Sequence, residues 1–365
     1  MNRRYLLFYQ RFSTDLCQFP QLPQKRKTKM TTIRKQRRLS VLTKGLSQKS
    51  GLFSKLIVKC LDENQQIPSE IKKIALYAVD DIGVLFRPCL FCMGVGLNSD
   101  KIESDYYDVA VAIELMQIST LVIDDIFDDS PTRNEKKTMP KQYGIKNTII
   151  LGELFRSLAN EIILNSQCLN NTEKQIILAY LEEANQKICI GQFWDLQYEK
   201  KDSITESEYF EMVAHTTGYF VQKSLLSGVV IAGISEKKHK ALAEYGLKLG
   251  MAYQLRDDLV NIFANGSNGK KVAEDLIAHK KRLPVICVMR DPNHGERFRK
   301  VWNKPIFSNS DIEKLLQIIE ESSAIECCRS YLVKLCEEAI ACVTPFDFGK
   351  KTEELIDLAN LVCSV

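Results

Sequence analysis

A group of aspartates at the end of a long apolar stretch constrains this chain most. Residues 109–123 are apolar over a wide helical face, and Leu121–Asp129 then brings Asp124, Asp125 and Asp128 within one helical turn. Carboxylates this close repel one another, and burying them unpaired costs free energy. A divalent cation offsets both effects. Because no His or Cys accompanies these oxygens, the pattern predicts a Mg²⁺ site.

The composition indicates an almost all-α globular protein. The chain has 365 residues, of which 45% are hydrophobic and 26% charged, with only ten prolines and seventeen glycines. Its long amphipathic segments lack the alternation typical of strands. The longest apolar run, residues 225–234, is too short to span a bilayer, so we expect no transmembrane segment.

The first 49 residues differ from the rest in charge. They hold thirteen Lys or Arg and one acid, Asp15, a net of +12 in a chain of net +4, which leaves −8 for the remainder. Nucleic acid is therefore not an expected partner. We expect residues 1–49 to be a basic leader, either a disordered tail or a mitochondrial transit peptide, followed by a single helical domain over 50–365. The protein is expected to be intracellular, either cytoplasmic or mitochondrial.

A second acidic cluster repeats the spacing of the first on another long predicted helix. It consists of Asp257, Asp258 and Asn261, and the preceding turns contain Gly246 and Gly250, small residues that permit close helix packing. Two such helices facing one another would present oxygen ligands from both sides, and Mg²⁺ ions between them could hold a diphosphate.

With these motifs the chain resembles the trans-isoprenyl diphosphate synthase superfamily and, within it, the eukaryotic geranylgeranyl diphosphate synthases. The segments that resemble family motifs are Asp124–Arg133, Gly191–Asp195, Gln254–Asn261 and Lys270–Pro284. The resemblance covers residues 52–343. It implies a bundle of antiparallel helices around a central cavity, three Mg²⁺ ions, a prenyl diphosphate substrate and a homodimer.

The resemblance also implies roles for individual residues. The expected metal ligands are Asp124, Asp125, Asp128, Asp257, Asp258 and Asn261. The five aspartates and Arg133 are the expected catalytic residues. The residues expected to bind substrate are Arg87, Gln117, Arg133, Thr216, Thr217, Gln254, Lys270 and Lys280.

Three positions depart from the family pattern. The family's isopentenyl diphosphate pocket uses a Gly-Lys-x-x-Arg segment, a His or Gln, and the second Arg of an Arg-Arg pair. Here Val84 stands in place of the Lys and Asn134 in place of the second Arg, while Gln117 keeps the His/Gln position. On the ionising side, Thr216 stands where the family usually has Lys. The loss of two charge-assisted hydrogen-bond donors is expected to weaken the binding of a diphosphate by roughly several kcal/mol.

These departures favour a Mg²⁺-dependent class I terpene synthase. Such an enzyme ionises one allylic prenyl diphosphate and releases diphosphate to give a terpene hydrocarbon or alcohol. The small residues Ser119 and Thr120 precede Asp124 and favour a C20 or C15 substrate. Two alternatives stay open. One is a geranylgeranyl diphosphate synthase, a prenyltransferase that condenses isopentenyl diphosphate with an allylic diphosphate. The other is a non-catalytic partner subunit of such a synthase.

Twelve cysteines are scattered along the chain, several of them, such as Cys287, in apolar surroundings. This usage predicts reduced, buried thiols. Cys89 and Cys92 have CxxC spacing but no second pair or nearby His, so core packing is favoured over a zinc site.

Overall fold

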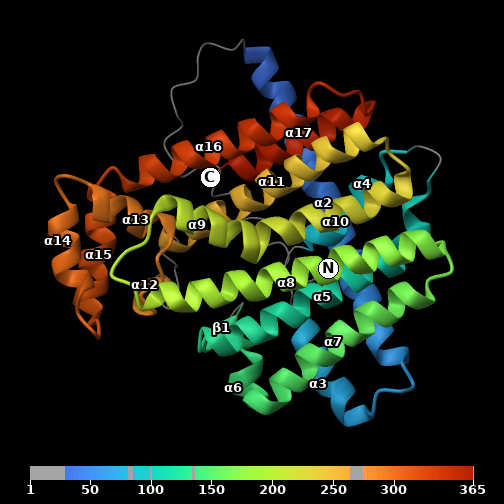
Figure 1. Ribbon diagram of the computed structural model, residues 1–365, viewed down its shortest axis with the longest axis horizontal. Coiled ribbons are helices and arrows are strands. Elements are labelled where there is room, and N and C mark those ends of the chain that lie inside the picture. Colours follow the sequence, from blue (N-terminus) through green and yellow to red (C-terminus); the bar gives the residue numbers. More distant parts are fainter. Residues whose placement is uncertain (1–28, 81–84, 99–100, 134–135, 264–273, 365) are drawn as a thin grey trace. The chain divides into compact units, whose positions relative to one another are not determined.

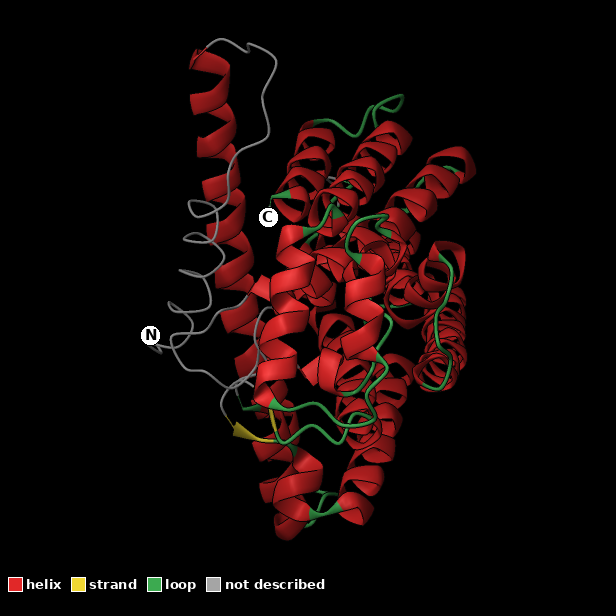
Figure 2. Ribbon diagram, turned by 90° about the vertical axis from the view of Figure 1, so that its left-hand side faces the viewer, coloured by secondary structure: helices red, strands yellow, loops and turns green. Residues whose placement is uncertain are grey.

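Helices make up nearly all of the described chain (Figures 1 and 2). The structure, a computed structural model, describes residues 29–80, 85–98, 101–133, 136–263 and 274–364. Within these ranges the strands are limited to a short hairpin, in which β1 (Thr132–Arg133) pairs antiparallel with β2 (Lys136–Lys137). The expectation of an all-α fold is confirmed. Among the described helices, none is both long enough and apolar enough to cross a membrane.

The chain forms two compact units. The first unit takes its residues from 1–182, 223–240 and 346–358, and the second from 183–222, 241–345 and 359–365. The predicted single domain over 50–365 stays a prediction.

The first unit is organised around α5 (Tyr107–Phe127), which packs along α4 (Phe86–Val95) and α7 (Ile145–Asn165) (Figure 1). Every residue from Val109 to Ser119 is buried, so α5 is covered on all sides, as a continuous apolar sequence favours. The other elements of this unit are α2 (Lys29–Glu63), α3 (Ser69–Val79), η2 (Glu103–Tyr106), α6 (Met139–Tyr143), and parts of α8 (Asn171–Glu199), α10 (Tyr219–Ala232), α11 (Glu236–Phe263) and α17 (Lys350–Cys363).

Helix α2 crosses the boundary predicted after residue 49. Leu46 is only 8% exposed, and Arg38 pairs with Asp357 of α17 at 2.9 Å. The last part of the predicted leader therefore packs within the first unit. The prediction of a transit peptide falls largely on residues 1–28, which lie outside the described residues, and stays a prediction.

The chain turns back sharply after α5. The N–H of Asp128 donates to the carbonyl of Asp124 at 2.9 Å, and Asp129 then adopts a positive φ of 47°. An aspartate tolerates this left-handed backbone better than most residues. The Thr138 hydroxyl donates to the carbonyl of Ser130 at 2.6 Å and fixes the far end of the hairpin. The turn brings the β1–β2 hairpin back beside the carboxylates at the end of α5.

The second unit contains most of the shorter helices. They are α9 (Glu206–Val213), the π-helix η3 (Ala214–Gly218), α12 (Glu274–Ile277), α13 (Leu283–Arg290), α14 (Gly295–Trp302), α15 (Asn309–Glu321) and α16 (Ala324–Val343). Thr205 and Glu208 form a capping box that fixes where α9 begins, because each side chain accepts a hydrogen bond from the other's backbone N–H. Helix α13 packs against α16.

The glycines predicted to allow close packing on α11 do so. A Cβ at Gly250 would lie 2.9 Å from the Cα of Gly218, and one at Gly246 would lie 2.9 Å from the Cα of Gln222. Both distances are shorter than real Cβ contacts. The α11 backbone can therefore approach η3 and α10 only because these positions lack a side chain.

Candidate active site

The first aspartate cluster is bound by Arg133. The Nε and Nη2 of Arg133 donate to the same oxygen of Asp125, at 3.0 and 2.8 Å, and Nη2 lies 3.9 Å from Asp124. The side chain of Asp125 is 5% exposed and that of Asp124 35%. Burial opposes a charge on Arg133, but Asp125, Asp124 and Asp128 more than offset it and raise the pKa of the guanidinium. One cation thus holds the predicted carboxylates together.

The cluster suits a hard divalent cation. It offers only oxygen ligands, and Asp124 and Asp128 are half-buried rather than closed off. Mg²⁺ usually takes one or two carboxylates, keeps several waters and shares substrate phosphates. The three aspartates therefore fit the predicted metal. Neighbouring Asp129 is 89% exposed and pairs with Lys141 at 2.5 Å, so it belongs to the surface.

Arg87 on α4 lies near a buried acid of α5. Glu114 is 4% exposed, and its burial raises its pKa to about 8, although the charge of Arg87 acts in the opposite direction. Gln117, one turn further along α5, is 9% exposed. Two of the predicted substrate-binding residues thus belong to neighbouring helices of the first unit. Sequence reasoning missed Glu114, which no local motif singles out.

The second cluster contains a chain of hydrogen bonds that ends on Asp258. Thr217 donates to the Oε1 of Gln254 at 2.8 Å, and the Nε2 of Gln254 donates to Asp258 at 2.9 Å. The hydroxyl of Tyr209 donates to the other carboxylate oxygen at 2.6 Å. Asp258 is 2% exposed. Three residues predicted to act on substrate or metal are therefore connected, and Tyr209 joins them.

Burial raises the pKa of Asp258 to about 7. Arg282 and the hydrogen bonds from Tyr209 and Gln254 favour the carboxylate, whereas Asp275 disfavours it. The proton on this group is therefore lost near neutral pH in the metal-free protein. A nearby divalent cation would favour the ionised form.

The other predicted residues of this cluster differ in exposure. Asp257 and Asn261 are exposed on α11, and their role as metal ligands stays a prediction. Thr216 lies in η3, and its hydroxyl donates back to the carbonyl of Met212 at 3.1 Å. π-Helical turns often occur at functional sites. Lys270 lies outside the described residues.

The predicted Lys280 pairs with Asp195 of α8, and both residues belong to the second unit. Lys280 Nζ lies 2.9 Å from one oxygen of Asp195, and Arg282 lies 3.2 Å from the other and 3.7 Å from Asp275. Burial opposes ionisation of Asp195, but Arg282 and Lys280 lower its pKa overall. Sequence reasoning missed Arg282. It lies 87 positions from Asp195, and the only local signal is a run of three basic residues, Lys280 to Arg282.

Comparison with known proteins agrees with this fold. The sequence pattern of the family described as Polyprenyl synthetase matches residues 68–319. A geranylgeranyl pyrophosphate synthase of Geoglobus acetivorans is 30% identical over 311 residues, which cover 83% of this chain and 91% of that relative. The crystal structure of a geranylgeranyl pyrophosphate synthetase from Pyrococcus horikoshii Ot3 matches with a TM-score of 0.79 at 26% identity, over 89% of this chain and 99% of that one.

The chain is thus an all-α enzyme of the isoprenoid synthase fold. It belongs to the Polyprenyl synthetase family. The superfamily expected from the aspartate motifs is confirmed.

The preferred prediction of a terpene synthase is wrong. The relatives matched here carry the names of geranylgeranyl and other isoprenyl diphosphate synthases, so the prenyltransferase alternative is better supported. The prediction gave too much weight to Val84 and Asn134. Losing a cation weakens the binding of one diphosphate, but such a loss does not create a different reaction.

Proposed function

We propose that the protein is a prenyltransferase that condenses isopentenyl diphosphate with an allylic diphosphate, as a geranylgeranyl diphosphate synthase does. The observation that carries the proposal is Arg133, which lies against Asp125 and Asp124 at the end of α5. The family supports it, and so do the relatives' names.

The carboxylates of both clusters are proposed to hold Mg²⁺ against the allylic diphosphate. The expected ligands are Asp124, Asp125, Asp128, Asp257, Asp258 and Asn261. Bound Mg²⁺ supplies Lewis-acid stabilisation of the leaving diphosphate. Arg133 adds charge-assisted donors to the same anion and orients Asp125, which already accepts two of its hydrogen bonds.

In the second unit, Lys280 is proposed to leave its ion pair with Asp195 and bind the diphosphate of the substrate instead. The Lys280 side chain is 2% exposed and its Nζ is paired with Asp195, and Arg282 would keep Asp195 neutralised after Lys280 turns to the substrate. The Thr217 hydroxyl donates a hydrogen bond to the Gln254 side-chain amide. The oxygen dipoles of these two side chains are proposed to stabilise positive charge on the allylic carbon.

Arg87 and Gln117 are proposed to bind the diphosphate of isopentenyl diphosphate. Glu114 lies near Arg87, and because burial raises its pKa to about 8, Glu114 is neutral below about that pH. With Val84 and Asn134 in place of two cations, we expect a raised KM for isopentenyl diphosphate.

A C20 product is proposed from the residues before the first cluster. Ser119 and Thr120 are small, and the Ser119 hydroxyl donates back to the carbonyl of Met116 at 2.7 Å, so neither position places a large side chain ahead of Asp124. A homodimer stays a prediction from the family resemblance.

A product assay tests the proposed reaction. Purified protein with Mg²⁺ receives dimethylallyl, geranyl or farnesyl diphosphate, each with and without isopentenyl diphosphate. The expected result is a longer prenyl diphosphate that forms only when both substrates are present. A hydrocarbon or alcohol from the allylic substrate alone would contradict the proposal.

Failure to form product from any pair would also contradict it. Val84 and Asn134 favour the non-catalytic subunit as the second candidate, and that candidate requires stimulation of an active synthase on mixing.

Restoring the missing cations with Val84→Lys and Asn134→Arg should lower the KM for isopentenyl diphosphate if the main proposal is right.

A further inference from the structure

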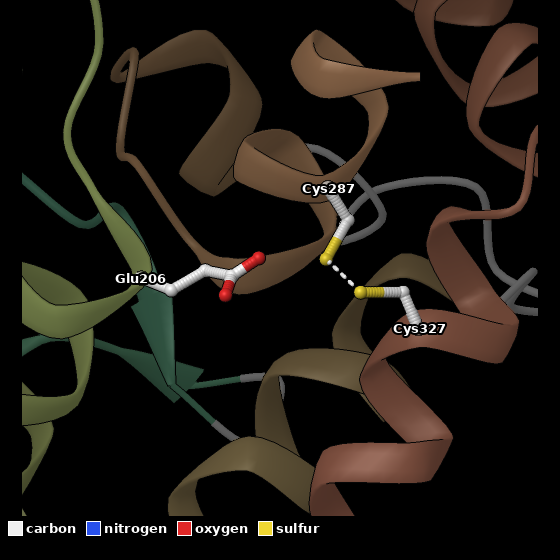
Figure 3. A group of neighbouring side chains, drawn as sticks. All are labelled: Glu206, Cys287 and Cys327. Atoms are coloured by element: carbon white, nitrogen blue, oxygen red, sulfur yellow. Dashed lines mark hydrogen bonds between the residues drawn. The ribbon is translucent and has the colours of Figure 1, made fainter. Parts of the chain in front are cut away.

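Two cysteines and a glutamate meet in the second unit, away from both aspartate clusters in sequence. Cys287 lies on α13, Cys327 on α16 and Glu206 at the start of α9, and their ligand atoms all lie within 4.8 Å of one another. Figure 3 shows the two sulfurs pointing toward each other and the carboxylate of Glu206 directed toward them. The sulfur of neighbouring Cys328 lies 4.0 Å from that of Cys287.

The sulfurs of Cys287 and Cys327 are only 2.7 Å apart. A disulfide has an S–S length of about 2.05 Å. Tetrahedral zinc with Zn–S bonds of about 2.3 Å would instead separate two sulfurs by roughly 3.8 Å. The pair is therefore closer to a covalent bond than to a metal site, and the cluster has only three candidate ligands among the described residues.

Glu206 is fixed in position by two other residues. Arg290 lies 2.9 Å from one of its carboxylate oxygens, and the hydroxyl of Tyr331 donates to the other. Because the carboxylate is fixed and directed toward the sulfurs, it can accept a thiol proton. Burial and the contact with Cys287 raise the pKa of Cys327 to about 12, so both partners begin as neutral thiols at pH 7.

We propose that Cys287 and Cys327 are an oxidation site, at which a hydroperoxide converts the two thiols into an intrachain disulfide. Cys327 is partly exposed, whereas Cys287 is 6% exposed, so Cys327 meets the oxidant first. Its sulfur attacks the hydroperoxide and the O–O bond breaks. The thiol becomes a sulfenic acid, and the other half of the hydroperoxide leaves as the corresponding alcohol, which is water for hydrogen peroxide.

Cys287 then completes the bond. Its sulfur attacks the sulfur of Cys327, the S–S bond forms and the S–O bond breaks. Glu206 takes the proton of Cys287 and passes it to the leaving hydroxide, which departs as water. In total, two thiols are oxidised and one hydroperoxide is reduced. With hydrogen peroxide, two waters result.

The bond would join α13 to α16 next to the substrate-binding segment. Helix α13 begins at Leu283, immediately after Lys280–Arg282, whose side chains bind Asp195 and Glu199. The two cysteines are 40 positions apart, and closing a loop of this size restricts the unfolded chain. The oxidised protein should therefore unfold at a higher temperature than the reduced protein.

Hydrogen peroxide added to the reduced full-length protein tests the proposal. Peptide mass spectrometry should find a Cys287–Cys327 link, formed faster as the pH rises because the thiolate is the reactive form. Glu206→Gln should slow the link. Cys342→Ser, elsewhere on α16, should leave it unchanged.

Comparing oxidised wild-type protein with oxidised Cys327→Ser isolates the stability effect. The wild type should have the higher Tm, and reduction should remove the difference. Because Cys327 is partly exposed, this variant should fold even if Cys287→Ser does not. Free thiols at both positions after oxidation would overturn the proposal. So would a Cys287–Cys328 link, or stoichiometric Zn²⁺ binding by the reduced protein that Cys327→Ser abolishes.

Discussion

Arg133 and Lys141 follow α5 closely in sequence, and each pairs with an aspartate, but their partners differ in burial. Arg133 binds Asp125, whose side chain is 5% exposed, whereas Lys141 binds Asp129, which is 89% exposed. Arg133→Gln should lower kcat/KM for the allylic substrate roughly 10- to 100-fold, because a charge-assisted hydrogen bond contributes about 1.5–3 kcal/mol. It should also raise the Mg²⁺ concentration needed for half-maximal rate. Steady-state kinetics at several Mg²⁺ concentrations measure both.

Lys141→Gln is the matched control. Its ion pair is exposed and contributes little, so kcat/KM should stay within about twofold of the wild type. Equal losses in both variants would show that charge around the turn matters in general. The assignment of Arg133 to the diphosphate would then be wrong.

Glu114 should make stability depend on pH. Its pKa is about 8 in the folded protein and about 4.5 in the unfolded chain, so between these values the folded state holds a proton that the unfolded state has released. The stabilising contribution of Glu114 is therefore fully present below the pKa of the unfolded chain. It is lost as pH rises through the pKa of the folded protein, and the free energy of unfolding falls by up to about 1.4 kcal/mol per pH unit.

Glu114→Gln should flatten this dependence. Urea unfolding between about pH 5 and about pH 8.5 should show the variant losing less stability than the wild type as pH rises. Parallel curves for the two proteins would mean that Glu114 is not protonated in the folded state.

Residues close together in sequence were predicted well, and distant partners were not. Asp124, Asp125 and Asp128 share a face because helical spacing demands it. Tyr209 lies 49 positions from Asp258, and no periodicity connects them. Only the tertiary structure shows this contact. The activity was mispredicted for a related reason, since counting cations at Val84 and Asn134 says nothing about how the remaining groups bind the substrate.

At the scale of elements, the two long helices that carry the aspartate clusters were predicted, whereas the β1–β2 hairpin and η3 were not. The β1–β2 hairpin has two residues in each strand, too few for alternation to appear in the sequence. The π-helical turn η3 follows α9 directly, without a break in the helix. One extra residue in a turn leaves little trace in an apolar pattern.

The contact between α4 and α10 is set by two glycines. A Cβ at Gly228 would lie 2.1 Å from the carbonyl oxygen of Phe91, and one at Gly94 would lie 2.5 Å from that of Leu225. Backbone atoms cannot move aside as a flexible side chain can. Gly228→Ala should therefore destabilise the protein by about 1–3 kcal/mol or more, as overpacking does. Chemical denaturation gives the value.

Gly45→Ala on α2 serves as its control. No atom lies within 4 Å of a Cβ at Gly45, so this change should stabilise the helix by up to about 1 kcal/mol. A neutral or stabilising effect of Gly228→Ala as well would show that α4 and α10 do not pack this closely.

At the scale of the whole molecule, truncation tests the boundary predicted after residue 49. Removing residues 2–28 keeps α2 and the pair between Arg38 and Asp357. This variant should retain the Tm and the activity of the full chain. Arg38→Ala in the full chain isolates the contribution of the ion pair.

Removing residues 2–49, the whole predicted leader, should have a different result. It deletes Leu46 from the core and takes Arg38 from Asp357, which is 5% exposed. Losing a buried leucine and leaving an acid buried without this partner should together cost about 3 kcal/mol or more. Thermal unfolding of the two truncated proteins measures the difference. Equal Tm values would mean that residues 29–49 are dispensable and that the boundary predicted from charge was placed correctly. A lower Tm for the longer truncation would place the boundary within α2.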